Sequence, residues 1–424
     1  MRSKKVVGDA LWSYMAFAIM ALSGVALNFT LGMTRGAEAV GVFNQTMAFY
    51  VIASHFAVFG MHNSVLYFCS AYPRHANAIL RKAILPVFFV ASAVSAAGFI
   101  FAPFIARALE SPNLVLSLQL ASLALLFFAF NKVVLAYLNS GLRMKVYAIA
   151  QSLRYLIILV CIIYICFEDI ALSFLGITFL ISEVVVSSFL LFLLARYKVF
   201  RTLQGPSDLR KMLIRFSYRS AGAGLLNEIN LRIDVLVLGF FMSDQVVGLY
   251  SFAAIFVEGF YNVGLVIRNI LNPYLVKAIK SGSYSDLEYF VKRMHPFNLI
   301  VSLAIFACVY FLYDPIIVDL LNMKDFAHAK DIIVVLFLFM SVYFLFIPFE
   351  EIVLISGRPL VHTAIYLGVI SFNLFFNIVL IPQYGVMGAA LSTGSAFIIM
   401  LISVTIYCRQ KLRISLICGT KIRK

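Results

Sequence analysis

Long apolar runs separated by short polar links make up the pattern of this chain over nearly its whole length. Each run has about the twenty residues that an α-helix needs to cross a bilayer. Strict alternation with a turn roughly every ten residues, which marks a membrane β-barrel, is absent. The pattern predicts an all-α integral membrane protein with about twelve transmembrane helices, near residues 10–34, 41–68, 83–109, 114–139, 147–167, 170–196, 217–242, 247–276, 293–321, 330–356, 360–382 and 387–408.

Composition strengthens this prediction and narrows the classes of function. Hydrophobic residues make up 63% of the 424 positions and charged residues only 12%, against about a quarter in soluble domains. The first apolar run is too long for the core of a signal peptide, so we expect it to remain as the first span. Little sequence lies outside the runs, and no cysteine spacing resembles a metal site. We therefore expect no enzyme active site, no cofactor and no bound metal.

The positive charges predict the orientation of the helices. With the N-terminus inside, 26 of the 34 Lys and Arg residues lie on the cytoplasmic side, four lie outside and four lie within spans. Such an excess marks the cytoplasmic face, so both termini are predicted to be cytoplasmic. The same bias accounts for most of the net charge of +15, and no nucleic-acid partner is needed to explain it.

A basic stretch from Arg196 to Arg219 divides the twelve spans into six plus six. Leu31-Gly32 recurs 207 residues later as Leu238-Gly239, which indicates two parallel repeats of the kind that rock around a shared central site. Apolar residues from Leu209 to Phe216 share one face and predict a short interfacial helix. The expected organisation is a six-helix lobe at 1–198, a basic cytoplasmic or interfacial linker at 199–216, a second six-helix lobe at 217–408 and a basic cytoplasmic tail at 409–424.

Charged residues in the middle of the seventh span are the strongest sign of function. Glu228, Arg232 and Asp234 lie within seven residues of one another, with Asn227 and Asn230 beside them. Charge at the centre of a bilayer costs several kcal/mol, and such residues usually face a partner or a wet cavity. The structural alternative is a salt bridge between Glu228 and Arg232, which are four residues apart.

The eighth span carries a second polar face. At about 100° per residue, its polar side chains cluster within roughly 120°. This stripe either lines a cavity or holds neighbouring helices together by hydrogen bonds. Its members are Glu258, Tyr261, Asn262, Arg268, Asn269 and Asn272.

Two smaller groups complete the candidates. Asn44, His55 and His62 are in line at helical spacing in the second span and are candidates to line a cavity. The histidines would form a protonation site or a weak metal pair, or they would be ordinary packing residues. Arg154 and Lys132 lie nearer the predicted cytoplasmic face, where they either receive a charged headgroup or extend to the interface.

The last two spans carry a recognisable motif, from Asn377 through Pro382, Gly385 and Gly388 to Thr393. It resembles the Asn-x-x-Leu-Ile-Pro-x-x-Gly-x-x-Gly-Ala-Ala-x-x-Thr signature of Wzx-type polysaccharide flippases, members of the multidrug/oligosaccharidyl-lipid/polysaccharide (MOP) exporter superfamily. Residues 248–251 are similar to the Gly-x-Tyr-Ser element of the same family. By itself the motif predicts a helix end at Pro382, a tight turn at Gly385 and close helix packing from Gly388.

The resemblance implies the MOP exporter fold and a transport function. The implied substrate is an undecaprenyl-pyrophosphate-linked oligosaccharide, such as an O-antigen repeat unit, moved by alternating access from the inner to the outer leaflet of the bacterial cytoplasmic membrane. Membrane lipids, and the polymerase and chain-length proteins of the same pathway, are the implied partners.

The candidate residues can be assigned to the parts of such a substrate. Arg232 and Arg268 suit the diphosphate, because arginine can bind phosphate oxygens with two parallel donors. The amides and hydroxyl of Asn227, Asn230, Tyr261, Asn262 and Asn269 suit the sugars. The carboxylates of Asp234, Glu258 and Glu228 are candidates to bind H⁺ or Na⁺ as the coupling ion.

Two other functions remain open on the sequence. One is another MOP-type exporter, for a drug or a different lipid-linked substrate such as lipid II. The other is a membrane polysaccharide polymerase or glycosyltransferase, which commonly needs a sizeable outer loop. The largest predicted outer loop, around residues 322–331, is about ten residues long.

Overall fold

The protein is almost entirely helical in its computed structural model, which describes residues 2–197, 199, 208–281, 284–412, 414–416 and 420–421. The strands in this described part are one short antiparallel pair, β1 (Ile414–Ser415) and β2 (Thr420–Lys421). The chain divides into two compact units, Met1–Arg232 with Ser243–Gln245, and Ile233–Met242 with Val246–Lys424. The division falls within the seventh predicted span, not in the basic segment before it.

Every predicted span falls mostly on helix, which confirms the all-α fold class. Nine helices in the described residues are long and apolar enough to cross a membrane, and a pair bent by 50°, Ala329–Phe344 with Ile347–Ile355, brings the number to ten. The first helix is counted once although it contains two predicted spans, and the helix of the seventh span is not in this count. The chain is a multi-pass membrane protein.

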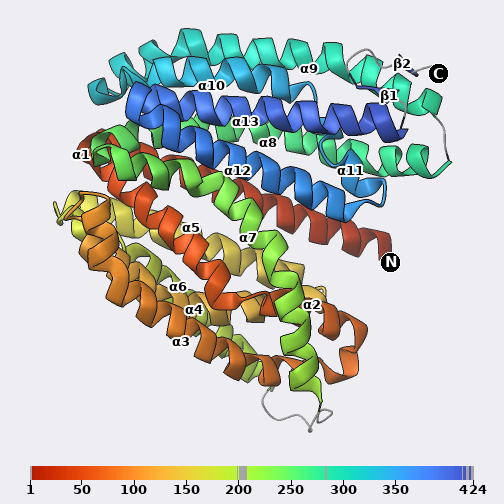
Figure 1. Cartoon of the computed structure of the whole chain (residues 1–424). Coiled ribbons are helices and arrows are strands. Elements are labelled where there is room, and N and C mark those ends of the chain that lie inside the picture. The colour runs from red at the N-terminus through yellow and green to blue at the C-terminus, as the bar shows by residue number, and fades with distance from the viewer. Residues whose placement is uncertain are drawn as a thin grey trace. The chain divides into compact units, whose positions relative to one another are not determined.

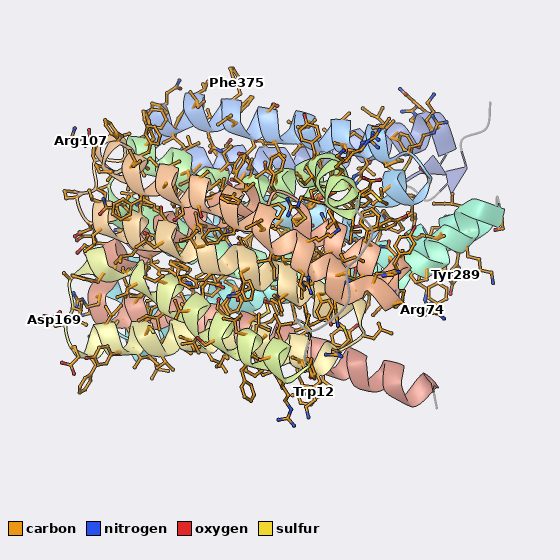
Figure 2. The ribbon with its side chains drawn as sticks, turned by 90° about the horizontal axis from the view of Figure 1, so that it is seen from below. Trp12, Arg74, Arg107, Asp169, Tyr289 and Phe375 are labelled. Atoms are coloured by element: carbon orange, nitrogen blue, oxygen red, sulfur yellow. The ribbon has the colours of Figure 1, made fainter. Side chains whose placement is uncertain are left out.

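Unit 1 is a bundle in which α3 packs against α4 and α1 against α5. Trp12 and Arg74 lie toward one end of this unit, and Arg107 and Asp169 lie at the other (Figure 2). The limits of the predicted spans put Arg74 and Arg107 in links on opposite sides of the membrane, and this separation agrees with that. Which side is cytoplasmic stays a prediction. Its helices are α1 (Arg2–Val58), α2 (Met61–Ala71), α3 (Ala76–Ala108), α4 (Leu114–Ser140), α5 (Met144–Phe167), α6 (Ile177–Arg196) and the first part of α7 (Leu209–Phe241).

Two glycines break the long helix that starts unit 1. Gly36 has a φ of 76° and separates the first two predicted spans within α1. Phe59 and Gly60, with φ of 43° and 72°, end α1, so α2 is a separate helix. The prediction of one continuous span over residues 41–68 is therefore wrong. A Cβ on Gly60 would stand 2.5 Å from the Ser217 carbonyl oxygen of α7, so this corner accepts only glycine at such a close approach.

The helix predicted for the basic segment also differs from the expectation. Residues from Leu209 onward form the first turns of α7, which is continuous to Phe241, so no separate short helix is present between residues 208 and 216. Ser217 and Ser64 share a hydrogen bond of 2.8 Å, and Ser64 also donates to the Leu213 carbonyl. The start of α7 is thus held against α2 within unit 1.

Unit 2 contains the remaining helices, of which α10 packs against α9 and α13, and Figure 1 shows these three side by side. Its core includes Phe260, whose ring centroid lies 5.0 Å from that of Phe337 and 4.7 Å from that of Phe344. Offset aromatic contacts at these distances add to the burial energy. The helices are α8 (Asp244–Ser281), α9 (Tyr284–Tyr313), α10 (Ala329–Phe344), α11 (Ile352–Ile355), α12 (Pro359–Tyr384) and α13 (Val386–Tyr407).

The turn between α12 and α13 confirms the structural role predicted for the motif. Gly385 has a φ of 57°, a conformation that favours glycine, and it joins the two helices directly. A Cβ on Gly388 would stand 2.3 Å from the Leu380 carbonyl oxygen, so the helices approach closely there. In detail, α12 extends to Tyr384, past the predicted end at Pro382, because a proline in the last turn removes a single backbone donor.

Candidate functional site

Asp234 of α7 is the centre of a buried polar cluster in unit 2. Its side chain accepts hydrogen bonds from the Asn377 amide (2.7 Å) and the Thr393 hydroxyl (2.7 Å). The Tyr250 hydroxyl donates to the same carboxylate at 3.2 Å and lies 2.9 Å from the Thr393 hydroxyl. Asp234 is 7% exposed. Four helices, α7, α8, α12 and α13, therefore meet at one carboxylate.

The oxygen atoms around Asp234 are of the kind that can bind a small cation or a proton. The Asn377 amide also donates to Asn373 Oδ1 at 2.6 Å, while Asn377 Oδ1 is buried and has no hydrogen-bond partner in the described part of the chain. Carboxylate, amide and hydroxyl oxygens are the ligands that hard cations prefer. The described residues contain no group of three or more His, Cys, Asp or Glu side chains placed to hold a metal ion.

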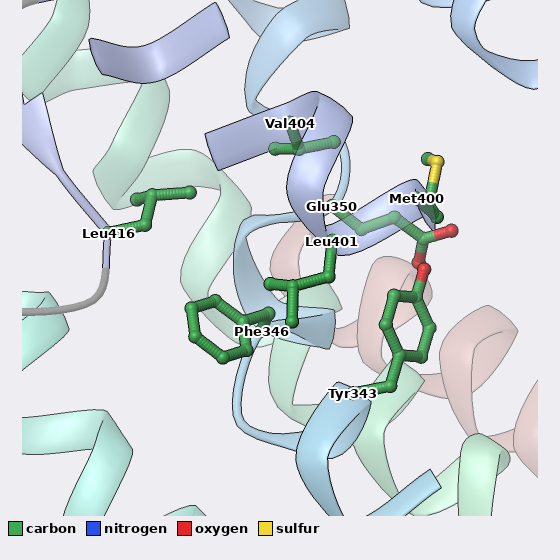
Figure 3. Close-up of a pocket in the computed structure, with 7 residues that line it drawn as sticks. All are labelled: Tyr343, Phe346, Glu350, Met400, Leu401, Val404 and Leu416. Atoms are coloured by element: carbon green, nitrogen blue, oxygen red, sulfur yellow. The ribbon is translucent and has the colours of Figure 1, made fainter. Parts of the chain in front are cut away.

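Arg268 of α8 lies in a second buried cluster of unit 2. Its guanidinium pairs with Glu350 (Nη1 to Oε2, 2.9 Å) and with Glu351 (Nη2 to Oε1, 3.5 Å). Glu350 also accepts from the Tyr261 hydroxyl at 3.0 Å and the Tyr366 hydroxyl at 2.5 Å. The Tyr343 hydroxyl points toward the same carboxylate, and both side chains line a small cavity (Figure 3).

The polar stripe predicted on the eighth span thus divides in the structure. Tyr261 and Arg268 face Glu350, and the Asn272 amide donates to Glu351 at 2.8 Å. Glu258 and Asn269 are exposed instead, and Asn262 is half-buried. Part of the stripe therefore makes interhelical hydrogen bonds, and the remainder is accessible.

Unit 1 has its own buried ion pair, between Arg154 of α5 and Glu183 of α6. Arg154 Nε lies 2.5 Å from Glu183 Oε1, and the two side chains are 9% and 1% exposed. The Tyr50 hydroxyl (2.9 Å) and the Asn131 amide (2.7 Å) donate to the same carboxylate. A second polar partner of Arg154 is the Gln151 side chain, which accepts from Arg154 Nη1 at 2.8 Å. Arg154 is therefore an interior residue, whereas the sequence placed it near the interface.

The other candidates in unit 1 are dispersed. Asn44 donates to Asn28 Oδ1 at 2.8 Å, and His55 lies 3.1 Å from the Val51 carbonyl oxygen of its own helix. His62 is on α2, beyond the break at Gly60, so it does not continue the line of Asn44 and His55. Lys132 is half-buried, with its ammonium 5.9 Å from the centre of the Phe128 ring.

The charged group predicted on the seventh span is described only in part. Asp234 is placed as above, and Arg232 is half-buried. The side chains of Asn227, Glu228 and Asn230 lie outside the described residues, so their predicted roles stay predictions.

Sequence reasoning missed several members of these clusters. The motifs that contain Asn377, Thr393 and Tyr250 predict only structural roles for them, although their amide and hydroxyl groups lie within apolar runs. The sequence patterns predict no role for Glu350 or Glu183. In each case the available signal was the same, namely a polar side chain in a membrane span.

Comparisons with known proteins agree with this architecture. Residues 9–280 match the family described as polysaccharide biosynthesis protein. An uncharacterized membrane protein of Methanocaldococcus jannaschii, MJ1068, is 31% identical over 132 residues, a match that covers 31% of this chain and 26% of that protein.

Two solved structures have the same fold. The lipid II flippase MurJ, in an inward closed conformation, has a TM-score of 0.76 at 16% identity, over 95% of this chain and 88% of that one. An inward-facing multidrug resistance MATE family transporter of the MOP superfamily has a TM-score of 0.70 at 13% identity, over 92% and 96%. The chain thus belongs to the polysaccharide biosynthesis protein family and has the fold of the MOP-superfamily exporters.

Proposed function

We propose that this protein is a Wzx-type flippase that moves an undecaprenyl-pyrophosphate-linked oligosaccharide from the inner to the outer leaflet of the bacterial cytoplasmic membrane. The observation that carries the proposal is the Arg268 cluster, in which a half-buried arginine pairs with two carboxylates beside tyrosine hydroxyls and an asparagine amide, in a member of a polysaccharide biosynthesis family. A diphosphate needs a cationic ligand, and arginine supplies one with a bidentate geometry. Arg232 is the second candidate for the diphosphate.

Asp234 is the proposed coupling site for H⁺ or Na⁺. Its carboxylate is buried among oxygen and amide ligands from α8, α12 and α13, and one neighbouring amide oxygen is unsatisfied in the described part of the chain. Binding of a cation there would neutralise a charge that is expensive within the membrane. Such binding would favour whichever transport state holds these helices together.

Glu258 keeps its proposed role as a second coupling group, because it is an exposed carboxylate on the same helix as Arg268. Asn262 and Asn269 keep their proposed role with the sugars. Tyr261 donates to Glu350, so its contact with substrate would require an exchange of partners.

The experiment that tests the function removes the gene from the source cell and assays lipid-linked oligosaccharides on each membrane face. Intermediates trapped on the cytoplasmic face support the flippase, and their mass identifies the repeat unit. Intermediates that reach the outer face unpolymerised favour a polymerase. If no lipid-linked sugar accumulates, another MOP-type exporter is favoured.

Variants then test the assigned residues. Arg232→Ala and Arg268→Ala are expected to lower translocation roughly tenfold or more while the protein still inserts, since a lost charged hydrogen bond is worth about 1.5–3 kcal/mol. Arg107→Ala is the matched control, because Arg107 is exposed at one end of unit 1 (Figure 2). Normal flipping by both test variants would exclude the arginine assignment.

A further inference from the structure

The break between α10 and α11 brings two adjacent carboxylates to α8. The segments Ala329–Phe344 and Ile347–Ile355 are bent by 50°, and Glu350 and Glu351 lie in the second of them, between the 3-10 turn Ile347–Phe349 and α11. α8 approaches this bend closely, because a Cβ on Gly264 would stand 2.7 Å from Ile347 Cδ1. Arg268, one turn after Gly264, therefore reaches both carboxylates.

The two carboxylates hold Arg268 unequally. Glu350 is 4% exposed in its side chain and accepts from two tyrosines as well as from Arg268 at 2.9 Å. Glu351 is 27% exposed and lies 3.5 Å from the guanidinium, with the Asn272 amide as its other partner. Glu350 is thus a fixed anchor, while Glu351 makes a longer and more accessible contact that can be exchanged.

The guanidinium has unused capacity for a second anion. Arginine presents five donors, and Arg268 Nε is buried without a hydrogen-bond partner among the described residues. Against the single charge of Arg268, the two carboxylates leave the cluster with one excess negative charge. A diphosphate would be repelled by that charge as long as Glu351 stays in place.

We propose that Glu351 is an internal competitor that occupies Arg268 in the substrate-free protein and is displaced by the diphosphate of the lipid-linked substrate. This proposal rests on the proposed function. Glu350 keeps the guanidinium oriented throughout, and Glu351 sets how tightly the diphosphate is held. Only the fraction of Arg268 that is free of Glu351 can bind the diphosphate, so the apparent affinity for the diphosphate is lowered by that fraction. The lower affinity allows this strongly charged group to be released after translocation.

The test measures binding of farnesyl diphosphate, a short prenyl diphosphate, to the purified full-length protein in nanodiscs. Glu351→Gln is expected to bind roughly two- to fivefold more tightly, the range for removing a partly exposed ion pair. Glu351 is accessible enough for this change to leave the fold intact. Glu168→Gln, at an exposed acid of unit 1, controls for the loss of one negative charge and should leave the affinity unchanged.

Two further variants keep the result unambiguous. Arg268→Ala should weaken binding, and Arg268→Ala with Glu351→Gln should bind no better than Arg268→Ala alone, because the competitor then has nothing to occupy. Equal or weaker binding by Glu351→Gln overturns the proposal and leaves Glu351 a structural role. Absence of binding by every variant also overturns it, whereas the flippase function is judged separately by the face on which intermediates accumulate in cells.

Discussion

The ion pair between Arg154 and Glu183 allows a sharp test of how unit 1 is stabilised. The pair is almost completely buried, and Glu183 also accepts hydrogen bonds from Tyr50 and Asn131. Glu183→Gln keeps the shape of the side chain but leaves the Arg154 charge facing an amide. Two unit charges about 4 Å apart attract by about 4 kcal/mol at an effective dielectric constant of about 20.

Breaking one side of a buried pair costs about 3–5 kcal/mol in other proteins, which agrees with that value. We therefore expect Glu183→Gln to lower the free energy of unfolding by about 3–4 kcal/mol. Arg154→Met should lower it less, because Glu183 keeps two hydrogen-bond donors. The double variant should lose no more than Arg154→Met alone, since removing both charges removes the unpaired one.

The assay is equilibrium unfolding in mixed micelles with increasing dodecyl sulfate, followed by circular dichroism. Ser188→Ala is the control on the same helix; its hydroxyl bonds to the Val184 carbonyl oxygen at an exposed position, so a change near zero is expected. Additive losses in the double variant, or a loss below about 1 kcal/mol for Glu183→Gln, would refute the charge-pair reasoning.

Three more outcomes are expected. Gly176→Ala should destabilise unit 1 by roughly 1–3 kcal/mol in the same unfolding assay, because the new Cβ would stand 1.9 Å from the Ser117 carbonyl oxygen. Gly368→Ala is its control and should be neutral, since a Cβ there has nothing within 4 Å. Asp234→Asn should reduce gradient-driven export at least about tenfold with normal membrane levels, and normal export would exclude Asp234 as the coupling site. In a chain free of other cysteines, a membrane-impermeant maleimide applied to intact cells should label Asp169→Cys and spare Arg74→Cys, and the reverse pattern would invert the predicted orientation.

The helices could be predicted from the sequence because each apolar run is long enough to identify a span by itself. The turn at Gly385 could be predicted as well, since proline and glycine act on the backbone locally. The break at Phe59–Gly60 could not, because His55 and His62 on either side of it have a spacing that also suits one continuous helix. One glycine in a membrane span does not predict a break.

The clusters were harder to predict because their members are distant in the sequence. Helical periodicity placed Tyr261 and Arg268 on one face of α8, but it carries no information on which neighbouring helix covers that face. The covering carboxylate, Glu350, is 82 residues from Arg268, and Asp234 is 143 residues from Asn377. Long-range pairs of this kind depend on the packing of whole helices.

The turn motif and the buried acid also bear on how sequences of this family can be sorted. Asn377 and Thr393, at the two ends of the motif, donate to Asp234, while Gly385 and Gly388 between them shape the turn. A chain with the motif but an apolar residue in place of Asp234 would keep the turn and lose the acceptor for both donors. The glycines therefore classify the fold, whereas the combination of Asn377, Thr393 and the acid marks the subgroup that would share the proposed coupling site.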